Sequence, residues 1–88
     1  MIIEFIGPLK KIAGAGRLEL TIDREMKLIE ILKILPEPIR KRVLESSGKL
    51  SPDIIFLVND VEVKSLGFEN ISVKPSDKIV MIPIIHGG

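Results

Sequence analysis

The stretch KIVMIPIIHGG, residues 78–88, runs from a continuous apolar segment through Pro83 to two glycines at the end of the sequence. The apolar run Ile79–Ile82 favours a strand. At average glycine usage, only about one chain in 200 closes on Gly-Gly by chance. The ending therefore favours a function for Gly87 and Gly88.

Upstream of this strand, turn residues separate further strands. Asn59-Asp60 predicts the turn of a hairpin between Ile54–Val58 and Val61–Val63, because both turn residues tolerate left-handed backbone. Ile71–Val73 is a candidate short strand, and residues 74–77, KPSD, are expected to form the turn before the last strand.

The first part of the chain predicts two strands joined by a loop. Residues 1–6 favour a strand, and segment 9–16 is expected to be a loop whose Gly14 and Gly16 permit tight turns. Residues 17–23 alternate cleanly between polar and apolar types. They predict a half-buried second strand, with one apolar face made of Leu18, Leu20 and Ile22.

The period changes from strand to helix after this point. One apolar stripe at helical spacing is formed by Leu28, Ile31, Leu32 and Leu35. Pro36 and Pro38 end that helix, and Pro38 suits the first turn of a shorter one that stops at Gly48. The apolar residues of this second helix are Ile39, Val43 and Leu44. The basic run Arg40–Arg42 is interpreted as its solvated face.

Together the elements predict an α+β fold in one domain. We expect a mixed sheet of four to five strands, packed on one main helix plus a short second helix. Residues 1–83 would form this domain and residues 84–88 a flexible tail. A chain of 88 residues supports only one hydrophobic core.

Composition excludes several classes of function. A net charge of +1 argues against a nucleic-acid platform, and no apolar stretch approaches the length of a membrane span. The absence of cysteine removes disulfides and thiolate chemistry, and the chain opens without a secretory signal. We expect a cytoplasmic protein with no nucleic-acid or membrane partner.

Side-chain chemistry offers little. His86 is the one histidine, which leaves no composition suited to zinc, and no carboxylate pair stands out as an acid and base. Gly14 and Gly16 lack the spacing and the following helix of a phosphate-binding loop. No metal site and no stably bound cofactor are expected.

The tail itself offers chemistry. Residues 84–88 form an arm that reaches about 16 Å when extended. Because glycine lacks Cβ, Gly87 and Gly88 would let the backbone enter a narrow tunnel in another protein. The final carboxylate would be the reactive group: attachment of AMP gives it a good leaving group, and sulfide, a thiol or an amine can then attack.

Three segments resemble the ubiquitin-like β-grasp sulfur carriers. FIGPLKKIAGAGRLELTI (5–22) is similar to their first hairpin, LVNDVEV (57–63) to their third and fourth strands, and VKPSDKIVMIPIIHGG (73–88) to their closing turn, strand and tail. The resemblance is greatest to the small subunit of molybdopterin synthase. It extends more distantly to the thiamine-pathway carrier and to ubiquitin-related modifiers, and the His86-Gly87-Gly88 ending also resembles the modifier used in tRNA thiolation.

The resemblance implies a β-grasp fold and a role for each tail residue. Gly88 would be adenylated by an E1-like adenylyltransferase that uses ATP, and then converted to a thiocarboxylate. Gly87 and His86 would thread through the partner. In molybdopterin synthase the tail would enter the large subunit and deliver sulfur to a pterin precursor, so no catalytic side chain is expected in this chain and its status as an enzyme stays open.

A continuous apolar strand also predicts a partner surface. A strand of a sheet covered on one side by a helix needs only one apolar face, so the second face of Ile79–Ile82 favours a protein interface. The expected interface residues are Phe68, Val80, Ile82 and Ile84. Two alternatives remain open: a protein modifier whose Gly88 ends as an isopeptide on a lysine, and a β-grasp binding domain whose glycines are incidental.

Overall fold

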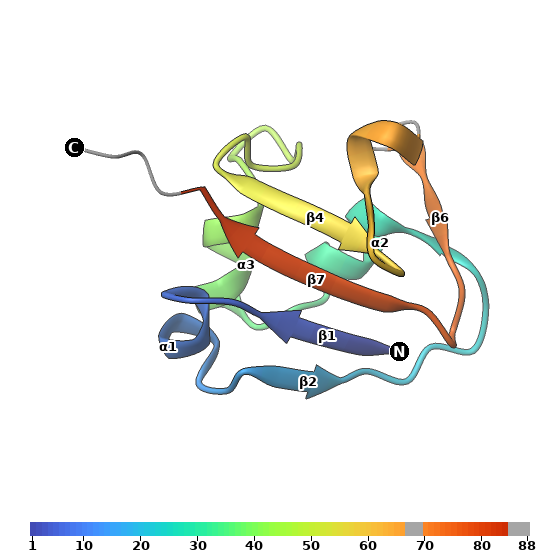
Figure 1. Ribbon diagram of the computed structural model, residues 1–88, viewed down its shortest axis with the longest axis horizontal. Helices are drawn as coiled ribbons and strands as arrows, with labels where there is room; N and C mark the ends of the chain where they lie inside the picture. Colours follow the sequence, from blue (N-terminus) through green and yellow to red (C-terminus); the bar gives the residue numbers. More distant parts are fainter. Residues whose placement is uncertain (67–69, 85–88) are drawn as a thin grey trace.

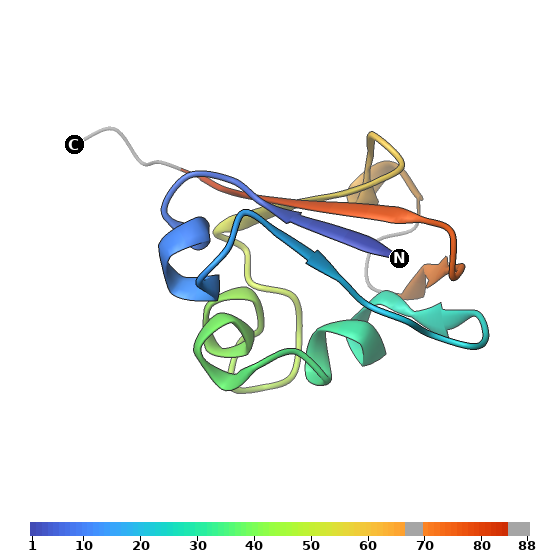
Figure 2. The ribbon, with the colours of Figure 1, turned by 90° about the horizontal axis from the view of Figure 1, so that it is seen from below.

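The structure, a computed structural model, describes residues 1–66 and 70–84. A sheet forms one layer and helices form the other, as Figure 2 shows from the side. In chain order the elements are β1 (Ile2–Phe5), α1 (Leu9–Ala13), β2 (Arg17–Glu19), β3 (Met26–Lys27), α2 (Leu28–Lys33), α3 (Glu37–Val43), β4 (Ile54–Val58), β5 (Val61–Glu62), the 3-10 helix η1 (Val63–Leu66), β6 (Ser72–Val73) and β7 (Lys78–Pro83).

The described residues form a five-stranded sheet in the order β2-β1-β7-β4-β5, with β7 at its centre (Figure 1). β7 runs parallel to β1 and antiparallel to β4, so the sheet is mixed. β3 and β6 pair separately from the main sheet. This arrangement confirms the predicted α+β fold with a mixed sheet on helices.

The core lies between the sheet and the helices. The four residues of the predicted helical stripe are at most 2% exposed, which confirms the periodicity argument: Leu28, Ile31, Leu32 and Leu35. From the sheet, alternate residues of the central strands meet them: Ile3, Phe5, Ile79 and Met81. Alternation of side chains across each strand places the remaining residues of β1 and β7 on the outer face.

The helical layer differs from the prediction in three respects. Segment 9–16 is not only a loop, because α1 occupies its first half, with Leu9 buried and Gly14 ending the helix at φ 79°. α3 has seven residues against six in α2, so the second helix is not the shorter one. Gly48 does not end α3, since it lies in the turn closed by the bridge between Leu44 and Leu50.

The strands also depart from their predicted lengths. The second strand stops at Glu19, although Ile22 beyond it is buried as expected. β3 was not predicted, because a pair such as Met26-Lys27 carries no visible alternation. β7 extends one residue past the predicted end, since Pro83 still pairs with Ile54.

The predicted hairpin turn is confirmed in detail. Asn59 and Asp60 have φ values of 49° and 71°, both in the left-handed region. The Asn59 amide nitrogen donates to Asp77 Oδ1 at 2.9 Å, and Asn59 Oδ1 accepts from the Lys78 backbone N–H at 2.9 Å. Asn59 therefore ties the hairpin to the turn that precedes β7.

We expect Asn59→Ala to lower the free energy of unfolding by about 1–2 kcal/mol, because alanine disfavours left-handed backbone and removes both side-chain bonds. Asn59→Gly should destabilise less, since glycine adopts the same φ without strain. Urea unfolding of the two variants separates the contribution of the backbone conformation from that of the side-chain hydrogen bonds. Equal destabilisation by alanine and glycine would mean that the positive φ makes no contribution.

Candidate functional site

The candidate site is the end of β7 where the tail begins. As the central strand, β7 is bonded on both sides, by β1 and β4. The ladder continues one step beyond Pro83, because the Ile84 N–H donates to the Asp53 carbonyl at 2.8 Å. The predicted tail 84–88 is thus held at its first residue. His86, Gly87 and Gly88 lie outside the described residues, and their roles stay predictions.

One residue expected on the exposed outer face of the sheet is buried. Val80 was expected to be exposed, but it is only 7% exposed, because Glu4 and Leu57 stand opposite it on the two neighbouring strands. Ile82 is half-buried and Ile84 is 37% exposed. Phe68 lies outside the described residues. Val80 thus contributes little accessible surface, and the interface role of these residues stays a prediction.

Two residues that the sequence analysis did not single out lie beside Ile82. Ile55 is its direct partner on β4 and is half-buried. Ile6, 38% exposed, follows β1 and donates its N–H to the Met81 carbonyl at 3.0 Å. The tail-root strip, defined as Ile6, Ile55, Ile82 and Ile84, is therefore an apolar surface next to the start of the tail. The uniformly apolar sequence of residues 54–58 gave no signal that distinguishes Ile55.

Charged groups do not form a reaction centre in the described part of the chain. No polar side chain there is fully buried, and no three His, Cys, Asp or Glu residues are placed to share a metal ion. The basic run of α3 is a solvated helix face, as predicted: Glu37 binds Arg40 at 3.8 Å and Lys41 at 3.0 Å, and Arg42 is exposed. No helix in residues 1–66 or 70–84 is long and apolar enough to cross a membrane.

Comparison with known proteins places this geometry in a family. Residues 1–88 match the family described as Urm1 (Ubiquitin related modifier). The chain is a member of the Urm1 family. Ubiquitin-related modifier 1 of Schizosaccharomyces pombe is 31% identical over 75 residues, which covers 85% of this chain and 71% of that protein.

Solved structures agree with the Urm1 assignment on the fold. SAMP1 from Haloferax volcanii superposes with a TM-score of 0.84 at 20% identity, over 100% of this chain and 98% of that one. A chain of the Amycolatopsis orientalis BexX/CysO complex gives 0.78 at 22% identity, over 99% and 98%. The predicted β-grasp, ubiquitin-like fold is confirmed.

Membership in the Urm1 family refines the expected relationship. The broader prediction, a ubiquitin-like sulfur carrier or modifier, is confirmed. The specific likeness to the molybdopterin synthase small subunit is not what the match names, since the family that matches the whole chain is the ubiquitin-related modifier. The ending His86-Gly87-Gly88, which resembles that modifier, was the sequence signal for this branch.

Proposed function

We propose that the Gly88 carboxylate is activated by an E1-like enzyme and carries sulfur as a thiocarboxylate. In the first step a carboxylate oxygen attacks the α-phosphorus of ATP and displaces pyrophosphate. In the second, sulfide attacks the acyl carbon and displaces AMP. ATP is bound by the activating enzyme, and the carrier holds no cofactor.

The observation that carries this proposal is the attachment of a Gly-Gly ending to the central strand in a Urm1-family chain. Pro83 and Ile84 are anchored by β4 and Asp53, so residues 85–88 start from a fixed point. A fixed origin limits the positions that the carboxylate samples, which favours delivery to an enclosed centre. The CysO chain of known structure was solved in a complex with BexX, which supports a protein partner for the present chain.

The family name supports a modifier role for the activated glycine, and the resemblance of the His86-Gly87-Gly88 ending supports a role in tRNA thiolation. Attack by a lysine amine in place of sulfide would leave Gly88 in an isopeptide bond, with loss of AMP. The resemblance of residues 73–88 to the molybdopterin synthase small subunit supports a second acceptor. In that case the tail would enter the large subunit of that enzyme and transfer sulfur to a pterin precursor.

Intact mass spectrometry tests the proposal. The chain is incubated with the E1-like enzyme of the same organism, ATP and sulfide, and the expected product has one oxygen replaced by sulfur at Gly88. Conjugates on lysine would identify the modifier reaction, and sulfur loss on addition of the large subunit and the pterin precursor would identify the second acceptor. An unchanged mass, or a mature protein that continues past Gly88, contradicts the proposal.

A further inference from the structure

The edge of β4 is only partly covered. In the described part of the chain, β5 pairs with Leu57 and Val58 and ends at Glu62, and η1 begins at the next residue, Val63. The first half of β4, Ile54–Phe56, therefore has β7 on one side and no strand on the other. An uncovered strand edge is a template for pairing with another chain.

Bond alternation identifies the backbone groups that face this edge. Asn59 donates its N–H to Lys78, and Asp53 accepts from Ile84, so the odd-numbered residues of this segment bond to β7. The even-numbered residues direct their groups to the opposite side. The Ile54 N–H is already bonded to the Ser51 carbonyl at 3.3 Å. The Ile54 carbonyl and the Phe56 N–H remain as an acceptor and a donor on either side of Ile55.

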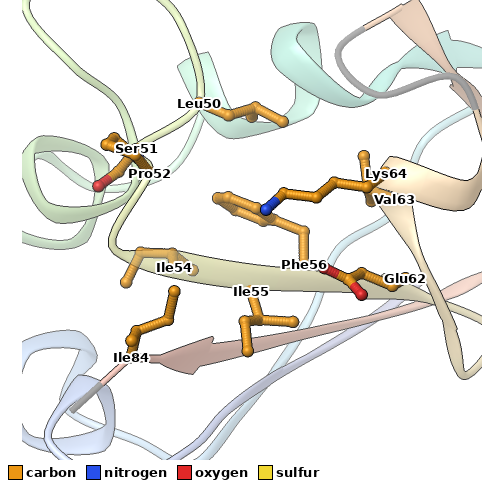
Figure 3. A pocket seen from close by; sticks show the side chains of 10 residues that line it. All are labelled: Leu50, Ser51, Pro52, Ile54, Ile55, Phe56, Glu62, Val63, Lys64 and Ile84. Carbon is orange, nitrogen blue, oxygen red and sulfur yellow. The ribbon is translucent and has the colours of Figure 1, made fainter. Parts of the chain in front are cut away.

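A pocket is lined by Ile54, Ile55 and Phe56, the segment that carries these two groups. We call it the β4-edge notch, and Figure 3 shows residues 50–52 on one side and residues 62–64 on the other, with β4 as its floor. Its lining residues are Leu50, Ser51, Pro52, Ile54, Ile55, Phe56, Glu62, Val63, Lys64 and Ile84. The cavity volume is about 40 Å³, far below that of a nucleotide or cofactor site, so it suits one short aliphatic side chain.

The shape and polarity of the notch specify an extended peptide. A residue in a strand parallel to β4 can donate to one carbonyl and accept from the N–H two residues further on, which matches Ile54 and Phe56. Three residues of open edge are too few for the interface of a stable dimer. Glu62 and Lys64 line the same side of the notch and carry opposite charges.

The position of the notch identifies the source of that peptide. Ile84, which begins the tail and bonds to Asp53, also lines the notch. A protein that takes up the tail beyond Ile84 therefore approaches this end of β4. We propose that an extended segment of the activating enzyme adds to the β4 edge as a parallel strand and places one aliphatic side chain in the notch. This inference rests on the proposed function, since it assumes that an E1-like enzyme receives the tail.

Amide hydrogen exchange tests the strand addition. In the free chain the Phe56 amide should exchange faster than those of Ile55 and Leu57, which face β7. Binding of the E1-like enzyme of the same organism, without ATP, should slow exchange at Phe56 at least tenfold. The Gly88-deleted chain should show the same protection, because the notch does not require the final carboxylate. A complex in which Phe56 exchanges as in the free chain overturns the proposal.

A matched pair of variants supplies a kinetic readout. Lys64→Trp fills the notch and should raise the KM for adenylation at least tenfold without changing kcat, whereas Lys11→Trp, on the exposed face of α1, should change neither. Melting curves verify that both variants fold. If both variants are adenylated at Gly88 with equal KM, the proposal that the activating enzyme binds in the notch is wrong, but the proposed function is unaffected. No adenylation of the wild-type chain overturns the proposed function itself.

Discussion

Deletion of Gly88 is expected to abolish thiocarboxylate formation while the melting temperature stays unchanged. The reacting carbon would move back by one residue, and a displacement of even about 1 Å from the productive geometry reduces rates by roughly 100-fold. Stability should persist, because the core of the described residues runs from Ile3 to Met81, and we expect the Gly-Gly ending to lie outside it. Intact mass after incubation with the activating enzyme, ATP and sulfide measures the first effect, and calorimetry measures the second.

A bulky residue at Gly87 should have the same consequence as the deletion. Gly87→Trp leaves the carboxylate in place but widens the tail, so a loss of activity would show that the tail must enter a narrow passage. Gly16→Trp is the matched control, since a Cβ there would meet only the flexible Lys10 side chain, at 3.5 Å. A fall in melting temperature that accompanies the loss of activity at Gly87 would refute the separation between folding and transfer.

Leu32→Ala is expected to lower the free energy of unfolding by roughly 2–5 kcal/mol, because it leaves a cavity in the core. Leu32 is 0% exposed and belongs to the stripe by which α2 packs on the sheet. The total stability expected for a chain of this length is about 4–13 kcal/mol, so the variant could be largely unfolded at elevated temperature. Urea unfolding with a linear extrapolation measures the change.

Ile34→Ala provides the control for this prediction. Ile34 is 55% exposed and lies at the C-terminal cap of α2, so its truncation should change stability by no more than about 0.5 kcal/mol. A Leu32 variant that unfolds with the wild-type curve would contradict the assignment of the helical stripe to the core.

The elements with a strong local pattern were predicted, and those formed by long-range contacts were not. The stripe from Leu28 to Leu35 and the Asn59-Asp60 turn carry their signal in adjacent residues. α1 was missed because its five residues are too few to show a helical period. β3 exists because β6 pairs with it from almost 50 residues further along the chain.

The candidate site likewise combines features visible in the sequence with features that depend on the pairing of distant strands. The interface roles predicted for Ile82 and Ile84 stay predictions, and the family match names the branch that His86-Gly87-Gly88 indicated. The low exposure of Val80 could not be predicted, because it depends on Glu4 and Leu57 in two other strands. Ile6 and Ile55 gain their place beside the tail only when β1 and β4 flank β7.

The chemistry proposed for Gly88 rests on consecutive residues, because Gly87 and Gly88 follow the apolar run closely in the sequence. The surface proposed to bind a partner is formed only by the tertiary structure. The β4-edge notch forms where residues 50–52, 62–64 and Ile84 meet around an early end of β5. A strand edge becomes available only when its neighbour stops short, and the length of that neighbour depends on packing, which no local pattern encodes.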